Sequence, residues 1–360
     1  MPEQTEKRAG LGKKLGCMFG VFIVGLLLIE GAVRIRQYMK HGTTETTVFS
    51  NTVDEATGLM IPEPNSTTGG IRISKRGFRN ADLDDPKPDG RVRLAFLGAS
   101  TTFCAEVSSN ATAWPHLVND ALAKRFPDRS FDYCNAGVPG YTTEESLTNL
   151  EGRVAPLKPD LILIYHATND LSGDTNTLAQ EGGIYTGKPE NPSWLAKISL
   201  TWYLIEKNLQ VAARQRQSQK ASGQLKFDPS QTEDAFRKRL ETLVVAAKNH
   251  ASAVALITFS VKVRREQDEK TRLDSCNTSL FYMPYMTVPG LLDGFEAYNR
   301  VIREVAQAHG VILIDGEHEI PGDDDHFNDS VHFKDLGCEK MAERVIRRLV
   351  AAPAFQSLVQ

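Results

Sequence analysis

From about residue 91 onward, short apolar runs alternate with longer amphipathic stretches. The apolar runs have the length of buried strands, and "LILIY" in the third is apolar on both faces, as in a sheet that helices cover on both sides. We predict strands at Val92–Leu97, Phe131–Cys134, Asp160–Tyr165, Ala253–Phe259 and Val311–Asp315. We predict helices at Trp114–Phe126, Glu144–Val154, Thr232–His250, Gly294–His309 and Leu336–Leu349. This alternation predicts an α/β fold with a three-layer, doubly wound sheet of five parallel strands.

Two insertions interrupt the alternation. The first spans about residues 171–230 and contains "NPSWLAKISLTWYLIEKNL", where we expect Asn191 to cap a helix that has Pro192 at its first position. The second spans about residues 261–292 and includes "SLFYMPYMTVPG", whose aromatic and methionine side chains suit an adaptable apolar wall. For both insertions, structural packing and covering of a substrate site remain open alternatives.

The N-terminal part of the chain contains one long apolar run. Residues 1–14 form a short basic segment, and residues 15–33 carry a single charge, Glu30, near their end. A helix of that length, at about 1.5 Å per residue, spans the hydrocarbon core of a bilayer. We therefore predict a retained membrane anchor at residues 15–33. A cleaved signal peptide is the alternative, but "EGAVRIR" contains no clear small-x-small cleavage site.

The charges around this run predict its orientation. Basic residues in the first 14 positions favour an N-terminus inside and the bulk of the chain outside the cytoplasm, in the periplasm. Three basic residues on the far side act against this orientation: Arg34, Arg36 and Lys40. Residues 34–90 show no strong period and are expected to form an extended arm that leads into a main domain at residues 91–352.

Composition and cysteine spacing exclude several classes of function. The chain has 360 residues and a net charge of -3, with no obviously basic face, so we expect no nucleic-acid partner. It contains neither a GxGxxG nor a GxxxxGK[ST] motif, and its five cysteines form no CxxC pair, so we expect no nucleotide cofactor and no zinc module. Outside the cytoplasm, Cys104 and Cys134 are the better placed disulfide pair, with buried free thiols as the alternative.

Small and polar residues gather directly after four of the predicted strands. The carboxyl ends of parallel strands meet at one edge of a sheet, where ligands bind. The clusters are Gly98-Ala99-Ser100, Asn135–Thr143 ("NAGVPGYTT"), His166–Asp170 ("HATND") and Phe327–Phe333 ("FNDSVHF"). Each cluster alone is typical of helix caps and turns. Their joint placement on one edge favours a catalytic site.

Together these clusters supply the groups that acyl transfer needs. The Ser100 hydroxyl is a nucleophile once His332 accepts its proton, and Asp329, three residues earlier, can orient that imidazole. The oxyanion needs donors already in place, which the Ser100 N–H, the Gly140 N–H and the Asn169 amide can provide. His326 is the alternative base. The acidic loop "GDDDHFND" has oxygen ligands but no EF-hand spacing, so we interpret it as a solvated loop instead of a calcium site.

In this arrangement the chain resembles the SGNH, or GDSL-type, hydrolase family, which is named for Ser, Gly, Asn and His in four blocks. The similar segments are "FLGASTTF", "NAGVPGYTT", "PDLILIYHATND" and "DSVHF", and the resemblance covers about residues 91–349 apart from the insertions. It implies a flavodoxin-like sheet, Ser100 as nucleophile, Asp329 and His332 as its triad partners, and Gly140 and Asn169 in the oxyanion hole. From the missing motifs we expect no cofactor and no metal.

Two positions depart from the family pattern. Ala99 stands where an acidic residue is usual, and Ala167 stands where glycine is usual. A GxSxG elbow is absent, which argues against an α/β-hydrolase proper.

The resemblance also bears on substrate and location. The apolar run followed by "RGFRN" is similar to membrane-tethered bacterial members of the family. The implied activity is cleavage of O-acetyl or lipid esters, with cell-envelope polysaccharide or lipid as the acyl carrier. Two alternatives stay open: transfer of an acyl group to a cell-envelope glycan by the same site, and a catalytically silent binding module with this fold.

Overall fold

A computed structural model describes residues 3–41, 44, 49–184, 193–218 and 223–360 of the chain. These residues form two compact units. The smaller unit comprises residues 1–48 and 189–210, and the larger comprises residues 49–188 and 211–360.

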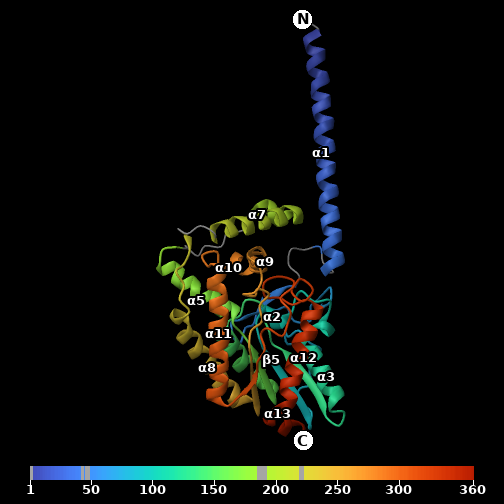
Figure 1. Ribbon diagram of the computed structural model, residues 1–360. Coiled ribbons are helices and arrows are strands. Elements are labelled where there is room, and N and C mark those ends of the chain that lie inside the picture. Colours follow the sequence, from blue (N-terminus) through green and yellow to red (C-terminus); the bar gives the residue numbers. More distant parts are fainter. Residues whose placement is uncertain (1–2, 42–43, 45–48, 185–192, 219–222) are drawn as a thin grey trace. The chain divides into compact units, whose positions relative to one another are not determined.

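A five-stranded parallel sheet forms the centre of the larger unit (Figure 1). Its strands are β5 (Arg91–Gly98), β6 (Ser130–Asn135), β7 (Leu161–Tyr165), β8 (Ala253–Ile257) and β9 (Ile312–Ile314). Their order in the sheet is β6-β5-β7-β8-β9, which is the doubly wound, flavodoxin-like order. The predicted fold class is therefore confirmed. The strand order reverses between β5 and β7, so the ligand-binding crevice is expected where these two strands end.

Helices cover both faces of the sheet, as the apolar strands require. Figure 1 shows α3 (Trp114–Arg125) and α12 (Asp335–Ala351) on one side of β5, with α8 (Ser230–His250) and α11 (Val288–His309) on the other. Helix α3 packs on α12, and α8 packs on α11.

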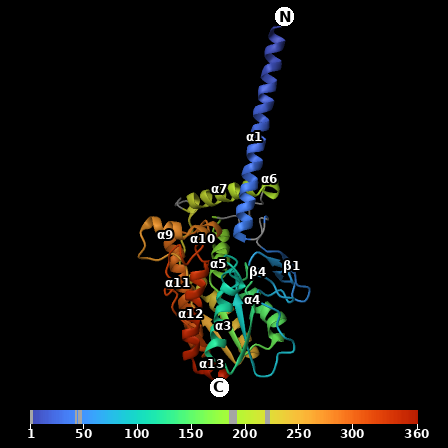
Figure 2. The ribbon, with the colours of Figure 1, turned by 90° about the vertical axis from the view of Figure 1, so that its right-hand side faces the viewer.

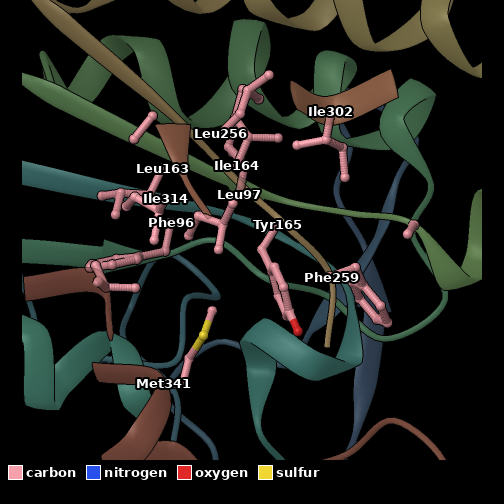
Figure 3. Packing of buried hydrophobic residues seen from close by; sticks show 14 of the residues in the cluster. Phe96, Leu97, Leu163, Ile164, Tyr165, Leu256, Phe259, Ile302, Ile314 and Met341 are labelled. Atoms are coloured by element: carbon pink, nitrogen blue, oxygen red, sulfur yellow. The ribbon is translucent and has the colours of Figure 1, made fainter. Parts of the chain in front are cut away.

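The hydrophobic core lies between these layers (Figure 3). Tyr165 at the end of β7 is fully buried, stacks on Phe259 with 4.7 Å between ring centroids, and accepts a 3.1 Å hydrogen bond from the Ser260 N–H. Met341 contributes to the core from α12 and Ile302 from α11. Each such apolar side chain stabilises the fold by about 1.5–3 kcal/mol on burial, which fixes the strand ends that carry the site.

Several element boundaries differ from those the sequence predicts. The helix predicted at Glu144–Val154 is α4 (Thr143–Asn149) followed by a π-helical turn (Leu150–Val154). Helix α11 begins at Val288 because the Thr287 hydroxyl caps it through the Gly290 N–H at 3.0 Å. The second insertion therefore ends before residue 292, after two short helices, α9 (Glu269–Ser275) and α10 (Asn277–Tyr282).

The first insertion also begins later than predicted. Helix α5 (Thr168–Glu181) runs through residue 171 because Leu171 faces the core and is fully buried. The expected cap at Asn191 and Pro192 lies outside the described residues. The first helix described after it, α6 (Trp194–Ile198), is capped instead by Ser193, whose hydroxyl accepts the Ala196 N–H.

The segment before the sheet differs from the predicted extended arm. Residues 34–41 continue helix α1 (Glu3–His41), and residues from 49 onward belong to the larger unit. Two small hairpins lie there, β1 (Asn51–Val53) with β2 (Met60–Pro62) and β3 (Thr67–Thr68) with β4 (Ile71–Arg72). The segment packs because its apolar side chains are buried, as at Ile61, Ile71, Ile73 and Phe78.

The cysteines of the chain are free. Cys17 is exposed and the other four are buried. Cys104 and Cys134 are therefore buried free thiols in this structure and do not form a disulfide. The Sγ atom of Cys104 lies 3.8 Å from the Sγ atom of Cys338 on α12. Cys134 is in β6, where its side chain is part of the core instead.

The smaller unit contains α1, α6 and the first part of α7 (Leu200–Ser218) (Figure 2). Within α1, residues Cys17–Met39 are long and apolar enough to cross a membrane. This range begins and ends later than the predicted anchor because helix α1 continues past residue 33, although its uninterrupted apolar part ends at Ile29.

Candidate active site

Ser100 stands at the point where β5 ends. The strand passes through Gly98 directly into a one-turn helix, α2 (Ser100–Phe103), and Cys104 closes that turn in the left-handed region with its N–H on the Ser100 carbonyl at 2.7 Å. A Cβ atom at position 98 would lie 2.0 Å from the Thr102 Oγ1, so only glycine fits there. Thr101, Thr102 and Phe103 are buried, whereas Ser100 is partly exposed. The turn therefore presents one hydroxyl at the edge of the sheet.

The loop after β6 packs tightly against this turn. The Asn135 amide donates to the Thr102 carbonyl at 2.9 Å and its oxygen accepts the Gly137 N–H at 3.1 Å. A Cβ atom at position 137 would lie 2.7 Å from the Phe103 backbone nitrogen, so a side chain there would push the two segments apart. The second block thus supports the position of Ser100.

The segment before the sheet holds the same turn from another side. Arg79, which is 1% exposed, donates to the Phe103 carbonyl at 2.7 Å and to the Asn110 side chain at 2.9 Å. The neighbouring Asn80 accepts the Asn135 N–H at 3.0 Å. The guanidinium thereby satisfies a carbonyl at the end of α2. The "RGFRN" motif pointed to this segment, but the sequence did not indicate this contact.

Ser100, His332 and Asp329 form a continuous chain of hydrogen bonds. The His332 Nε2 lies 2.8 Å from the Ser100 Oγ, and its Nδ1 lies 2.8 Å from the Asp329 Oδ2. The other Asp329 oxygen accepts the backbone N–H groups of Val331 and His332, both at 2.9 Å. This geometry fixes the imidazole with one nitrogen toward a carboxylate and the other toward a hydroxyl, as proton transfer from a serine requires.

The second insertion supports the turn that carries the histidine. The Ser330 hydroxyl, between Asp329 and His332, accepts the N–H groups of Thr278 and Ser279 at the start of α10, at 3.0 and 3.2 Å. The Lys262 N–H donates to the Ser330 carbonyl at 2.9 Å. The contacts of this insertion with residues 329–332 are therefore structural packing, which is one of the two alternatives given for it.

Nearby carboxylates favour a charged imidazole. Burial disfavours imidazolium, but the Glu106 carboxylate, and after it the hydrogen bond and charge of Asp329, outweigh burial and raise the pKa of His332 from 6.5 to about 9. Burial raises the pKa of Asp329, but the hydrogen bond and charge of His332 and the backbone donors bring it below its ordinary value. Burial raises the pKa of Glu106, whose Oε2 is buried without a hydrogen-bond partner among the described residues. Sequence analysis missed Glu106 because no motif contains it.

Asn169 lies in the first turn of α5, which follows β7, and Gly140 lies in the loop after β6. The Asn169 amide donates one proton to the Tyr141 carbonyl at 2.8 Å, which leaves its second proton for another acceptor. Gly140 has φ +92°, a conformation that favours glycine, and open space where a Cβ would be. Ala167 has φ −171°, which any residue adopts, so alanine in place of the usual glycine causes no backbone strain there.

The remaining residues of the clusters face elsewhere. His166 is buried with its Nε2 2.7 Å from the Ser146 Oγ, and burial lowers its pKa to about 4. The His326 Nδ1 lies 2.7 Å from the Asp323 Oδ1 and, in the described residues, neither histidine bonds to Ser100. Among the described residues, no group of three or more His, Cys, Asp and Glu side chains is arranged to hold a metal ion.

Comparison with known families identifies the larger unit. Residues 96–340, more than half of the chain, match the model of the GDSL-like Lipase/Acylhydrolase family. The chain belongs to this family. The resemblance drawn from the four blocks is therefore confirmed, and the chain is an ester hydrolase of the SGNH/GDSL type.

Solved structures give more distant likenesses. The acetylxylan esterase Axe2 from Geobacillus stearothermophilus aligns with a TM-score of 0.45 and 17% identity over 71% of this chain and 93% of that one. LAE5, an alpha/beta hydrolase enzyme from the metagenome of Lake Arreo in Spain, aligns with a TM-score of 0.44 and 16% identity over 74% of this chain and 96% of that one. At these values neither likeness bears on substrate. No curated protein matches the chain significantly.

Proposed function

We propose that the chain cleaves O-acetyl or lipid esters of the cell envelope with Ser100 as nucleophile, His332 as general base and Asp329 as the group that orients the base. The observation that carries this proposal is the pair of 2.8 Å contacts that link Ser100 to His332 and His332 to Asp329. The position of Ser100 also supports the proposal. Ser100 follows β5 at the point where the strand order reverses, which is where ligands bind in sheets of this kind.

In the proposed acylation step the Ser100 Oγ bonds to the ester carbonyl carbon while His332 Nε2 takes the hydroxyl proton. The carbonyl oxygen becomes an oxyanion, for which we assign the Ser100 N–H, the Gly140 N–H and the free Asn169 amide proton as donors. Collapse breaks the bond to the alcohol, which receives the proton from imidazolium. Water then repeats the sequence on the acyl-enzyme, so that the acid leaves and Ser100 regains its proton.

The test is covalent labelling combined with turnover. A fluorophosphonate probe should label the folded protein at Ser100 alone, and Ser100→Ala should abolish both labelling and hydrolysis of an aryl acetate. His332→Ala should remove most of the rate, since an unactivated serine hydroxyl is a weak nucleophile. Ser357→Ala, which removes an exposed hydroxyl near the C-terminus, is the matched control and should label fully.

The outcomes separate the alternatives. Hydrolysis that persists in Ser100→Ala would contradict the assignment of the nucleophile. A well-folded wild-type protein with neither labelling nor turnover would be a silent binding module. If a sugar acceptor present in the assay became acylated in preference to water, the same site would be a transferase.

We further propose that α1 is retained as a membrane anchor and that the larger unit lies in the periplasm. The length and apolar character of Cys17–Met39 support the anchor, and the basic residues ahead of it support the orientation. Protease added to intact spheroplasts should digest residues beyond position 48 while the protein remains with the membranes. Protection of those residues would contradict the orientation.

A further inference from the structure

The first insertion carries an apolar stripe that stays exposed in the described part of the chain. The side chains that form it are large, more than 40% exposed, and spaced three or four residues apart: Trp194, Ile198, Trp202, Ile205 and Leu209. In contrast, Ala196 and Leu200 between them are buried. An amphipathic segment with tryptophan and aliphatic residues on one side is typical of helices that lie in a membrane interface.

A partly buried polar contact joins this segment to helix α1. Glu30 accepts the N–H groups of Leu200 and Thr201 at 2.9 and 3.0 Å and the Ser199 hydroxyl at 2.8 Å. The first-turn N–H groups of a helix have no partner within the helix, so the carboxylate caps α7. Its negative charge also interacts favourably with the positive end of the helix dipole. We name this contact, together with the Arg34 bonds described next, the Glu30–Arg34 clamp.

Arg34 completes the clamp by binding the end of α6, on the N-terminal side of Ser199, which separates the two helices. Its Nε pairs with the Glu30 Oε1 at 2.7 Å, and its Nη2 donates to the Ile198 carbonyl at the end of α6, at 3.2 Å. The clamp thus binds the last turn of α6 and the first turn of α7 to one level of α1. Both views draw α7 running across the direction of α1 (Figures 1 and 2).

The level of the clamp on α1 sets where the stripe lies. No charge interrupts the apolar run between Leu15 and Ile29, and Glu30 is the first charge after it. A charged side chain at that position lies at the boundary between hydrocarbon and water, where partners satisfy it at low cost. A helix held at this level and running across α1 lies along the membrane surface, at the depth that tryptophan prefers.

We propose that α6 and the first part of α7 form a membrane-interface element, with the stripe in the boundary between lipid headgroups and acyl chains of the bilayer that α1 crosses. This inference rests on the proposed anchor. Exposed Lys197 and Lys207 add attraction to anionic lipid. Residues 194–209 of the first insertion are then a second membrane contact of the smaller unit, instead of packing for the hydrolase or a cover of its site.

Tryptophan fluorescence of the full chain in lipid vesicles tests this directly. The chain has three tryptophans, and Trp114 is fully buried in the larger unit, so quenching by lipid reports on Trp194 and Trp202. In phosphatidylcholine–phosphatidylglycerol vesicles brominated near the headgroup end of the acyl chains, emission should fall by about half relative to plain lipid, because two of the three indoles lie at the interface. The double variant Trp194→Phe with Trp202→Phe should lose this difference.

Three further variants, one of them a control, test the stripe and the clamp. Leu209→Glu places a charge on the stripe and should reduce the quenching, whereas Asn208→Glu, on the neighbouring exposed polar face, should leave it unchanged. Glu30→Ala should reduce the quenching of Trp202 while the protein stays in the vesicles, because α7 then loses its cap on α1.

The outcomes distinguish this inference from the anchor itself. Extraction of the wild-type protein by alkaline carbonate would overturn both the anchor and the interface element. Resistance to extraction together with equal emission in brominated and plain lipid would overturn the interface element alone. Equal emission with a cross-linked dimer through residues 194–209 would show that a second copy of the chain covers the stripe instead.

Discussion

Glu106→Gln is expected to increase the activity of this hydrolase at neutral pH. The carboxylates of Glu106 and Asp329 together raise the pKa of His332 from 6.5 to about 9 against the effect of burial. That net rise corresponds to about 3 kcal/mol in favour of imidazolium, and burial acts against it. Glu106 is the first of the groups that raise the pKa, so its loss should lower the pKa by about one unit, or roughly tenfold in the protonation constant. Only neutral imidazole accepts the Ser100 proton, so the substitution should move the acidic limb of the profile to lower pH.

The assay is kcat/KM for an aryl acetate from pH 5 to 10, corrected at each pH for spontaneous hydrolysis. This ratio reports the ionisation of the free enzyme. In wild type it should rise with pH through the pKa of His332, and in Glu106→Gln the midpoint should fall by about one pH unit, with a gain of about tenfold at pH 7. The glutamine keeps the size of the side chain, so the plateau should change little.

Glu339→Gln, an exposed glutamate on α12, is the matched control and should leave the profile unchanged. An unchanged midpoint in Glu106→Gln, with thermal stability equal to wild type, would refute the electrostatic coupling of Glu106 to His332. A midpoint moved to higher pH would refute it equally, since loss of a negative charge cannot stabilise imidazolium.

Three other changes test the site and its support. Asn169→Ala should lower kcat by roughly a hundred- to a thousandfold with little change in KM, measured by steady-state kinetics, and a smaller loss would contradict its oxyanion role. Arg79→Ala should lower the free energy of unfolding, measured by urea titration, by about 3 kcal/mol or more, because it leaves buried carbonyl groups unpaired. An unchanged urea concentration at the midpoint of unfolding would contradict this. Peptide mapping after mild oxidation should find Cys104 linked to Cys338 and not to Cys134.

The sequence predicted the sheet because each strand is apolar and each is followed by a distinct turn. It also predicted that Ser100 and His332 would meet, although 232 positions separate them, because the ends of parallel strands share one edge. It could not predict the contacts of Arg79 or the carboxylate of Glu106. Both depend on which side chains face each other after packing. Neither the periodicity of the sequence nor a motif indicates the partner of a buried arginine or glutamate.

The boundaries of the insertions failed for a related reason. Leu171 belongs to a helix whose first turn contains the third block, so a motif residue and a core residue share one element. Pattern alone assigned the motif to a loop and began the insertion directly after it. The Glu30 charge likewise predicted only the end of the apolar run, since its partners lie far along the chain at residues 199–201.

The contacts of Arg79 and Asn80 with the turn of Ser100 determine where the enzyme tolerates cutting. Cleavage before residue 49 breaks the covalent link between α1 and the larger unit and leaves every group around Ser100 in place, while residues 189–210 of the smaller unit stay attached to the larger one. Cleavage between residues 80 and 91 leaves the sheet intact but detaches the arginine that holds the end of α2. Activity is therefore expected to survive the first cut and not the second, whether or not either cut releases the protein.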